Sequence, residues 1–163
     1  MPGTLEGRWF TFTARGHVNV RAKHRTTLEV TREDWLTPRG DCILGVSSEV
    51  GAAGLPGWIR EAARDPGSVI VMVLCSGGVC DSVAGRGDPR ITLDDPDRIV
   101  VRRSTYVDGK TLMVEASKAA AHVRRDLVEH LRRGEPLLVA LTVLPGLLKR
   151  PAGGGAPDPG PGV

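Results

Sequence analysis

The hydrophobic and polar positions of this chain predict mainly short β-strands. Runs of β-branched and apolar residues recur along the sequence, and Gly, Pro or Asp residues separate one run from the next. This punctuation is typical of strands that are joined by tight turns. The runs cover residues 9–14, 18–31, 42–46, 68–75, 79–84, 99–106, 111–114 and 137–144.

Two segments follow the helical period instead. The first spans residues 55–64, and the turn sequence at 65–67 ends it. The second spans residues 117–133, with Ser117 as its expected N-cap and Gly134 as its terminator. Its apolar stripe consists of Ala116, Ala120, Val123, Leu127 and Leu131.

The order of these segments predicts an α+β fold, because one helix interrupts a series of strands and another lies near its end. The sequence Gly40-Asp41 before the apolar run 42–46 resembles the Gly-Asp turn of small pseudo-barrel folds. We therefore expect a mostly antiparallel, partly closed, barrel-like sheet. A single domain should span residues 8–144, between a disordered N-terminus at 1–7 and a disordered Pro/Gly-rich tail at 145–163.

The composition is that of a globular protein, since 40% of the residues are hydrophobic and 25% are charged. The formal net charge of +3 and the sequence pI near 9.0 suit a polyanionic partner without requiring one. We expect no signal peptide, because residues 1–6 contain neither a basic segment nor an apolar one, and the longest apolar run, residues 69–75, is too short to span a bilayer. We therefore expect a soluble, cytoplasmic protein with no membrane partner.

The chain contains no glutamine and a single asparagine, Asn19. Hyperthermophilic proteins tend to lose heat-labile amide side chains, although a guanine-cytosine-rich genome has a similar effect. A single retained amide indicates a position where it is hard to replace. Asn19 either supports a tight turn in the left-handed conformation, which we favour, or hydrogen-bonds a ligand through its donor and acceptor.

The three cysteines argue against a disulfide framework. Cys75 and Cys80 flank an expected hairpin turn and could form a bridge, but we favour buried free thiols for them. No second cysteine pair or spaced histidine pair completes a zinc site. The sequence therefore predicts no metal site, and it identifies no cofactor.

The most polar part of the run 18–31 contains the best candidate for acid–base chemistry. If residues 20–31 form one strand, alternate side chains lie on opposite faces, and His24 and Thr26 interrupt an otherwise apolar face. Such a pair must find hydrogen-bond partners or line a cavity. His24 is then either a satisfied core histidine, which we favour, or a general acid or base. The opposite, solvated face carries Arg21, Lys23, Arg25, Thr27, Glu29 and Thr31.

Two further residues could join His24 in a catalytic site. His17 precedes it by an odd interval, so the two rings meet only if the chain bends at residues 16–18. We do not expect a metal site built from this pair. Asp41 belongs to the Gly-Asp sequence and stands beside a turn at the start of a strand, where its carboxylate could orient an imidazole ring.

A basic surface forms if the strands that carry the arginines are neighbours. Its members would be Arg21, Lys23, Arg25, Arg86, Arg90, Arg102 and Arg103. Such a surface suits phosphates, although cations on a strand are as often simply solvated. Aromatic residues are too few for the stacking of several bases.

Three motifs of the chain resemble those of a known family. They are GHVNVRAKHRTTLE at residues 16–29, LTPRGDCILGV at 36–46 and GRGDP at 85–89. With them the chain resembles the archaeal domain of unknown function 371 family over nearly the whole ordered domain. The resemblance implies an archaeal source and no particular activity.

Two positions depart from the pattern of that family. Val18 follows the first histidine where the family tends to have proline, and Asp88 stands where the family tends to have a second histidine. These departures argue against a mechanism that uses histidines from both motifs.

We expect the protein to bind a phosphate-bearing ligand, RNA or a nucleotide, over a basic β surface near residues 16–29. The candidate ligand-binding residues are Asn19, Arg21, Lys23, Arg25, Thr26, Thr27, Glu29, Arg86 and Asp88. One alternative is a small enzyme in which His24, steered by Asp41 or Glu29, acts in a barrel cavity; the other is a structural or assembly protein. The sequence decides neither whether the chain is an enzyme nor its oligomeric state.

Overall fold

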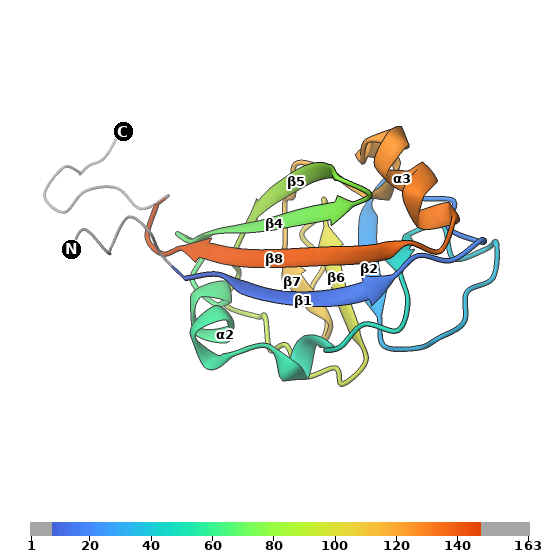
Figure 1. Ribbon diagram of the computed structural model, residues 1–163. Coiled ribbons are helices and arrows are strands. Elements are labelled where there is room, and N and C mark those ends of the chain that lie inside the picture. The colour runs from blue at the N-terminus through green and yellow to red at the C-terminus, as the bar shows by residue number, and fades with distance from the viewer. Residues whose placement is uncertain (1–7, 148–163) are drawn as a thin grey trace, which may run out of the picture.

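The computed structural model of the protein describes residues 8–147, in which eight strands accompany two α-helices (Figure 1). The strands are β1 (Phe10–Arg15), β2 (Thr27–Thr31), β3 (Ile43–Gly45), β4 (Val69–Ser76), β5 (Val79–Arg86), β6 (Arg98–Arg102), β7 (Thr111–Met113) and β8 (Pro136–Leu144). The helices are α2 (Gly57–Ala63) and α3 (Arg125–Arg132), preceded by the short 3-10 helices η1 (Ala52–Gly54) and η2 (Ala120–His122). The predicted α+β class is confirmed.

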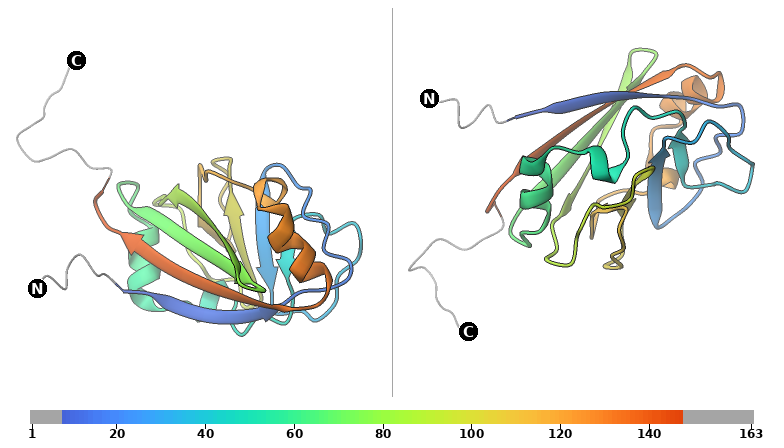
Figure 2. Two further views of the ribbon diagram at one scale, coloured as in Figure 1. Left: turned by 45° about the horizontal axis from the view of Figure 1, so that its top comes forward. Right: turned by 90° about the horizontal axis from the view of Figure 1, so that it is seen from below.

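The strands form two four-stranded sheets that face each other across the core (Figure 2). The first has the order β1-β8-β4-β5 and is antiparallel throughout. The second has the order β3-β2-β6-β7, in which only the central pair is antiparallel. Met72 opposite Leu141 in the first sheet, and Leu28 opposite Val101 in the second, are completely buried. Helices α2 and α3 lie at opposite ends of the first sheet (Figure 1).

The two sheets do not close into a barrel within residues 8–147. Their edges meet only at isolated bridges, which pair Arg15 of β1 with Val46 and Arg86 of β5 with Val114. Each bridge has two backbone hydrogen bonds of 2.8 to 3.0 Å. The expected partly closed, barrel-like sheet is therefore not confirmed.

The second half of the domain repeats the architecture of the first. The series β1, β2, β3, η1, α2, β4 is followed by β5, β6, β7, η2, α3, β8 in the same order. Exchanging the halves also reproduces the strand order of both sheets, so an approximate two-fold axis relates them. We call residues 16–26, between β1 and β2, the basic loop, and residues 87–97, between β5 and β6, the acidic loop. These two loops occupy equivalent places in the repeat.

Details of the backbone support this internal duplication. Four non-glycine residues have a left-handed φ, and they form two equivalent pairs within residues 8–147. Ala22 and Leu93 lie in the basic and acidic loops, with φ of 52° each, and Ser47 and Glu115 follow β3 and β7, with φ of 51° and 50°. Unusual conformations that recur at matching places indicate a shared backbone path.

The two loops also share their side-chain-to-backbone hydrogen bonds. His24 Nδ1 accepts from the amides of the residues two and three positions later, at 3.2 and 3.1 Å, and Asp95 Oδ1 does the same, at 2.9 Å each. His17 Nδ1 and Asp88 Oδ1 each accept from the amide two positions later, at 3.0 and 2.9 Å. A histidine ring nitrogen in one half thus accepts the hydrogen bonds that a carboxylate oxygen accepts in the other.

The expected strand over residues 18–31 is much shorter than predicted. Only Thr27–Thr31 forms a strand, and the basic loop before it has no regular structure. The left-handed φ at Ala22 breaks the alternation that a continuous strand requires. Consequently His24 and Thr26 are exposed rather than directed at the core, and Glu29 and Thr31, which were expected in solvent, are buried.

The expected helix over residues 117–133 is also shorter, because α3 begins only at Arg125. Ser117 does not cap a helix; its hydroxyl accepts a hydrogen bond from the Ala84 amide at 3.1 Å. All five residues of the predicted apolar stripe are nevertheless buried. The pattern of burial was right, while the helical conformation of its first half was wrong.

Cys75 and Cys80 form a disulfide across the β4–β5 hairpin, so the prediction of free thiols for this pair is wrong. Cys80 is exposed and Cys75 half-buried, and Cys42 is a free, half-buried thiol. No helix within residues 8–147 is long and apolar enough to cross a membrane. The expected disordered segments, apart from residues 145–147, lie outside the described residues.

Candidate anion-binding site

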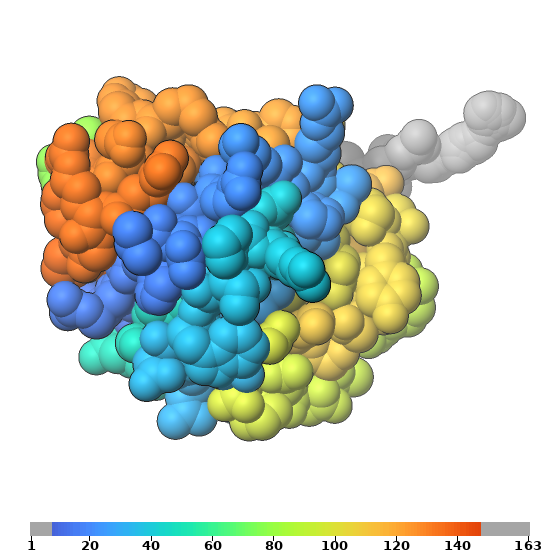
Figure 3. All heavy atoms as spheres, turned by 90° about the vertical axis from the view of Figure 1, so that its right-hand side faces the viewer, coloured from blue at the N-terminus to red at the C-terminus, as the bar shows by residue number. Residues whose placement is uncertain are grey.

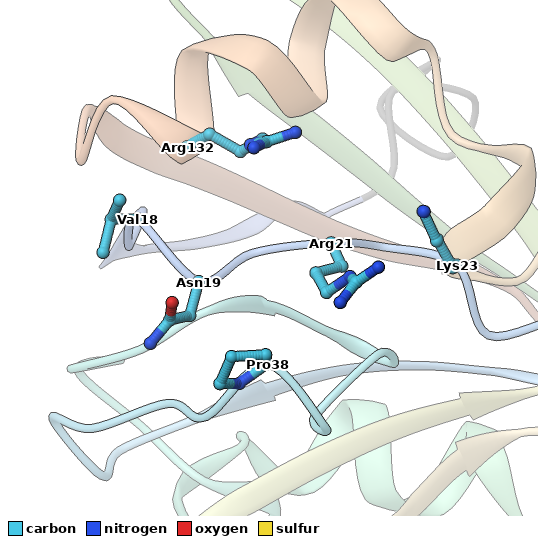
Figure 4. A pocket seen from close by; sticks show the side chains of 6 residues that line it. All are labelled: Val18, Asn19, Arg21, Lys23, Pro38 and Arg132. Atoms are coloured by element: carbon cyan, nitrogen blue, oxygen red, sulfur yellow. The ribbon is translucent and has the colours of Figure 1, made fainter.

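A surface pocket of about 370 Å³ opens beside the basic loop. The loop crosses one face of the molecule between α3 and the loop of residues 32–41, where Figure 3 shows it as a blue band between orange and light-blue atoms. The pocket is lined by Val18, Asn19, Arg21, Lys23, Pro38 and Arg132 (Figure 4). Three separate segments of the chain therefore contribute to one concave site.

The charge of this pocket is entirely positive. Arg21 and Lys23 come from the basic loop, Arg132 comes from the last turn of α3, and no lining residue is acidic. The side chains of these three cations form no ion pair or hydrogen bond with the described residues, and all three are exposed. Their donors are therefore available to a ligand.

Asn19 connects two of the segments that line the pocket. Its Nδ2 donates to the carbonyl oxygen of Leu36 at 2.7 Å, which ties the basic loop to the loop of residues 32–41. Asn19 lies in a turn but does not have the left-handed φ that was expected. Its Oδ1 accepts no hydrogen bond from residues 8–147. Because Asn19 lines the pocket, this oxygen is available for the second predicted role, a contact with a ligand (Figure 4).

The acidic loop provides an internal comparison, because its equivalent site is already satisfied. Arg90, at the place of Asn19, donates to both carboxylate oxygens of Asp88 at 2.9 and 3.1 Å, and these bonds hold the pKa of Asp88 below its ordinary value. Asp94 stands at the place of Lys23. Arg64, at the place of Arg132, donates to the carbonyl oxygen of Ile91 at 3.1 Å. The unpaired cations are thus specific to one of the two equivalent sites.

The positive surface continues beyond the pocket along the basic loop. Arg25 is exposed, and its carbonyl oxygen accepts from Arg103 Nη1 at 3.4 Å. The same Nη1 lies 3.4 Å from His122 Nε2. Arg25 and Arg103 form no ion pair with any described carboxylate, so four of the seven cations expected in a basic surface are unpaired and lie on or against this loop.

The other three predicted members of that surface are neutralised elsewhere. Arg86 pairs with Glu115, Arg90 pairs with Asp88 at 2.9 Å, and Arg102 pairs with Asp108 at 2.9 Å. Arg86, Asp88 and Arg90 therefore lie in or beside the acidic loop rather than in the pocket. The predicted surface is divided, and the four cations of it that remain unpaired lie outside the strands.

The predicted catalytic residues do not form a cavity. His24 is exposed, and the Thr26 and Thr27 amides and hydroxyls all point at its Nδ1, at 3.0 to 3.2 Å. His17 Nδ1 accepts a hydrogen bond from the Asn19 amide within its own turn. Asp41 meets His24 through the backbone, where its carbonyl oxygen accepts from the His24 amide at 3.3 Å. None of these residues lines the pocket.

Glu29 forms a separate buried cluster with two neighbours. Only 5% of its surface is exposed, its Oε2 lies 3.3 Å from Arg98 Nη1, and its Oε1 lies 3.6 Å from Cys42 Sγ. Burial raises the pKa of Glu29 above its ordinary value of 4.5, against the attraction of Arg98. Burial, together with the Glu29 charge, raises the pKa of Cys42 to about 11. Glu29 is thus inaccessible to a ligand in the pocket.

Arg132, Val18 and Pro38 are the lining residues that the sequence did not indicate as ligand contacts. Arg132 comes from the other half of the chain, and nothing in its local pattern separates it from Arg133 beside it. Only the packing of α3 against the basic loop brings it to the pocket. No group of three or more His, Cys, Asp or Glu side chains in the part of the chain that the structure describes could hold a metal ion.

The fold and this site define an internally duplicated α+β protein with a cationic pocket at one of its two equivalent sites. The chain belongs to the family described as a domain of unknown function, DUF371, whose pattern it matches over residues 12–144. It is also 36% identical, over 134 residues, to an uncharacterized protein of the archaeon Methanocaldococcus jannaschii. That match covers 82% of this chain and 98% of the relative. The predicted family is confirmed.

Proposed function

We propose that this protein binds a phosphate-bearing ligand, RNA or a nucleotide, in the pocket beside the basic loop. One observation carries the proposal: Arg21, Lys23 and Arg132 converge on a single pocket without a carboxylate partner, while the equivalent site at the acidic loop is satisfied internally. Like charges that are gathered without counter-charges repel one another. An anion in the pocket removes that repulsion.

The donors of the pocket suit phosphate in particular. An arginine guanidinium can donate two parallel hydrogen bonds to phosphate oxygens, and a lysine ammonium supplies a compact charge. The volume of about 370 Å³ lies at the lower end of the range for small-ligand sites. It can hold one phosphate group with part of the adjoining molecule.

The cations outside the pocket favour RNA as the form of this ligand. Arg25 and Arg103 extend the unpaired positive charge along the loop beyond the lining residues. A nucleotide can contact only the pocket, whereas a single strand has further phosphates for these two side chains. Since no described contact places His24 in a cavity, we do not advance the enzyme hypothesis.

Affinity measurements on matched variants test the proposal. We expect a labelled single-stranded RNA to bind the wild-type protein, and Arg21→Ala and Arg132→Ala each to weaken binding about tenfold, the loss of one charge-assisted contact. Arg133→Ala is the control, because Arg133 lies beside Arg132, pairs with Glu135 at 3.8 Å and does not line the pocket. Equal loss in the control and test variants would contradict the proposed site.

A second comparison separates the two forms of the ligand. If RNA is the ligand, Arg25→Ala and Arg103→Ala weaken RNA binding, and ATP is a poor competitor. If a nucleotide is the ligand, ATP displaces the RNA and these two substitutions have little effect. Binding of neither probe at micromolar protein and about 50 mM salt would refute the proposal, because even non-specific electrostatic binding is detectable under these conditions.

A further inference from the structure

The Cys75–Cys80 disulfide lies at the tip of the β4–β5 hairpin, where the two residues face each other. Their Cα atoms are 4.1 Å apart, closer than the roughly 4.5–5.5 Å that separates residues opposite each other in an antiparallel pair. Because Cys80 is exposed, a thiol in solution can approach the bond from the Cys80 side. The anion-binding proposal makes no use of this bond.

The same hairpin tip holds both ends of α3. At the beginning of the helix, Asp81, the residue after Cys80, accepts a hydrogen bond from the Arg124 amide at 2.9 Å, and Arg124 Nη1 donates to the Cys80 carbonyl oxygen at 3.4 Å. Towards the end of the helix, Gly77 packs against the ring of His130, so closely that a Cβ on Gly77 would lie 2.2 Å from Nδ1. The hairpin tip is therefore one of the contacts that position α3.

Helix α3 in turn supplies Arg132 to the pocket, as the close-up view shows (Figure 4). A continuous series of contacts thus leads from the disulfide, through the hairpin tip and α3, to one of the three pocket cations. The equivalent helix of the other half, α2, has no such restraint, because the described residues contain only this disulfide.

We propose that Cys75–Cys80 is a site of reversible thiol–disulfide exchange with a dithiol, and that its oxidation state sets the position of α3 and hence the affinity of the pocket. The effect on affinity rests on the proposed function, whereas the effect on α3 does not. The oxidised bond holds the strands together and keeps Arg132 at the pocket. Reduction lets the tip open and loosens both of its contacts with α3.

The exchange requires no component other than the dithiol. One thiolate of the dithiol attacks Sγ of Cys80, breaks its bond to Cys75 and forms a mixed disulfide, while the Cys75 thiolate that leaves takes up a proton. The second thiol of the dithiol then attacks the first sulfur of the dithiol, which is bonded to Cys80 in the mixed disulfide. This step closes a ring and releases the Cys80 thiol. Two electrons and two protons pass in total from the dithiol to the protein.

Cys42 does not take part in this exchange. It is half-buried beside Glu29 in the second sheet, and its raised pKa of about 11 keeps it a thiol at neutral pH. Because the thiolate is the reactive form, Cys42→Ser should leave the response to a dithiol unchanged. It is the matched control for substitutions at the hairpin.

Amide hydrogen exchange tests the link to the helix without any ligand. We expect dithiothreitol to increase exchange in α3 of the wild-type protein by at least about tenfold, and exchange in α2 to stay the same. The double variant Cys75→Ser/Cys80→Ser should show the faster exchange with or without dithiothreitol, and Cys42→Ser should respond as the wild type does. Unchanged exchange in α3 on reduction, with the free thiols verified by alkylation, would overturn the proposal.

Binding of a labelled single-stranded RNA tests the link to the pocket. We expect the reduced protein and the double variant to bind about threefold or more weakly than the oxidised protein. If the RNA binds both forms equally, the disulfide does not control the affinity of the pocket. Its effect is then confined to the hairpin. If the RNA binds neither form, the proposed function fails, and the exchange experiment still decides the effect on α3.

Discussion

Replacing either of two equivalent glycines with alanine tests the internal duplication directly. A Cβ on Gly16 would lie 2.0 Å from the carbonyl oxygen of Leu131, at the end of α3. A Cβ on Gly87 would lie 2.6 Å from the carbonyl oxygen of Ala63, at the end of α2, and 2.3 Å from that of Asp65. Each loop thus passes the end of a helix at the same place in its half, and only a residue without a side chain fits there.

The structure also gives the scale of the expected effect. Ordinary contact with a Cβ begins at 3.4 Å, so in each variant two backbone segments must separate by roughly 1 Å. Overpacking against the backbone costs about 3 kcal/mol of the free energy of unfolding. In a domain of this size that loss lowers Tm by about 10 °C. Gly16→Ala and Gly87→Ala should therefore destabilise the protein to a similar extent in chemical denaturation.

Gly57→Ala is the control for this comparison. Gly57 begins α2, and a Cβ there meets no atom within 4 Å. Alanine at this helical position should leave stability unchanged or raise it by about 0.5 kcal/mol. If Gly16→Ala were as stable as the wild type while Gly87→Ala was not, the two loops would not pack equivalently, and the duplication would not extend to them.

Two further substitutions test the core and the buried carboxyl group. Leu127→Ala should lower the free energy of unfolding by about 3 kcal/mol, because Leu127 is completely buried, whereas the exposed Glu129→Ala should change it by less than about 0.5 kcal/mol; equal urea midpoints would contradict this packing. Glu29→Gln should gain stability relative to the wild type as pH rises from about 4 to about 8. The raised pKa of Glu29 means that its protonated form favours folding, so the wild type loses this contribution as pH rises through the folded-state pKa. A pH-independent difference between the two proteins would show that Glu29 does not titrate as described.

The predicted strands were found because runs of β-branched and apolar residues between Gly, Pro and Asp residues leave a direct mark on a sequence. In β4, for example, Ile70, Met72 and Leu74 are buried and the residues between them are half-buried. The basic loop misled the same reasoning, because Val20 and Ala22 are buried as they would be in a strand. The hydrogen bonds that His17 and His24 accept from nearby amides stabilise a loop, and a histidine in sequence carries no signal of that role.

The candidate site could be predicted only in part, because it is assembled from both halves of the chain. Arg21, Lys23 and Asn19 were identified from one motif, since they lie together in the sequence as well as in the pocket. Arg132 reaches the pocket only through the packing of α3, which no local pattern encodes. The duplication itself left a faint trace, the Arg-Gly pair that ends β1 and β5 at residues 15–16 and 86–87, but the loops that follow differ in nearly every side chain.

An NMR titration measures the central claim most directly, because it locates the ligand as well as detecting it. At 17.4 kDa the protein is small enough for amide shifts to be followed residue by residue as a single-stranded RNA is added. We expect the largest shifts at the amides of Asn19, Arg21, Lys23 and Arg132, and none at the equivalent Arg90, Thr92, Asp94 and Arg64. Shifts of equal size at both sets of residues, or no shifts at all, would contradict a phosphate-binding pocket at the basic loop.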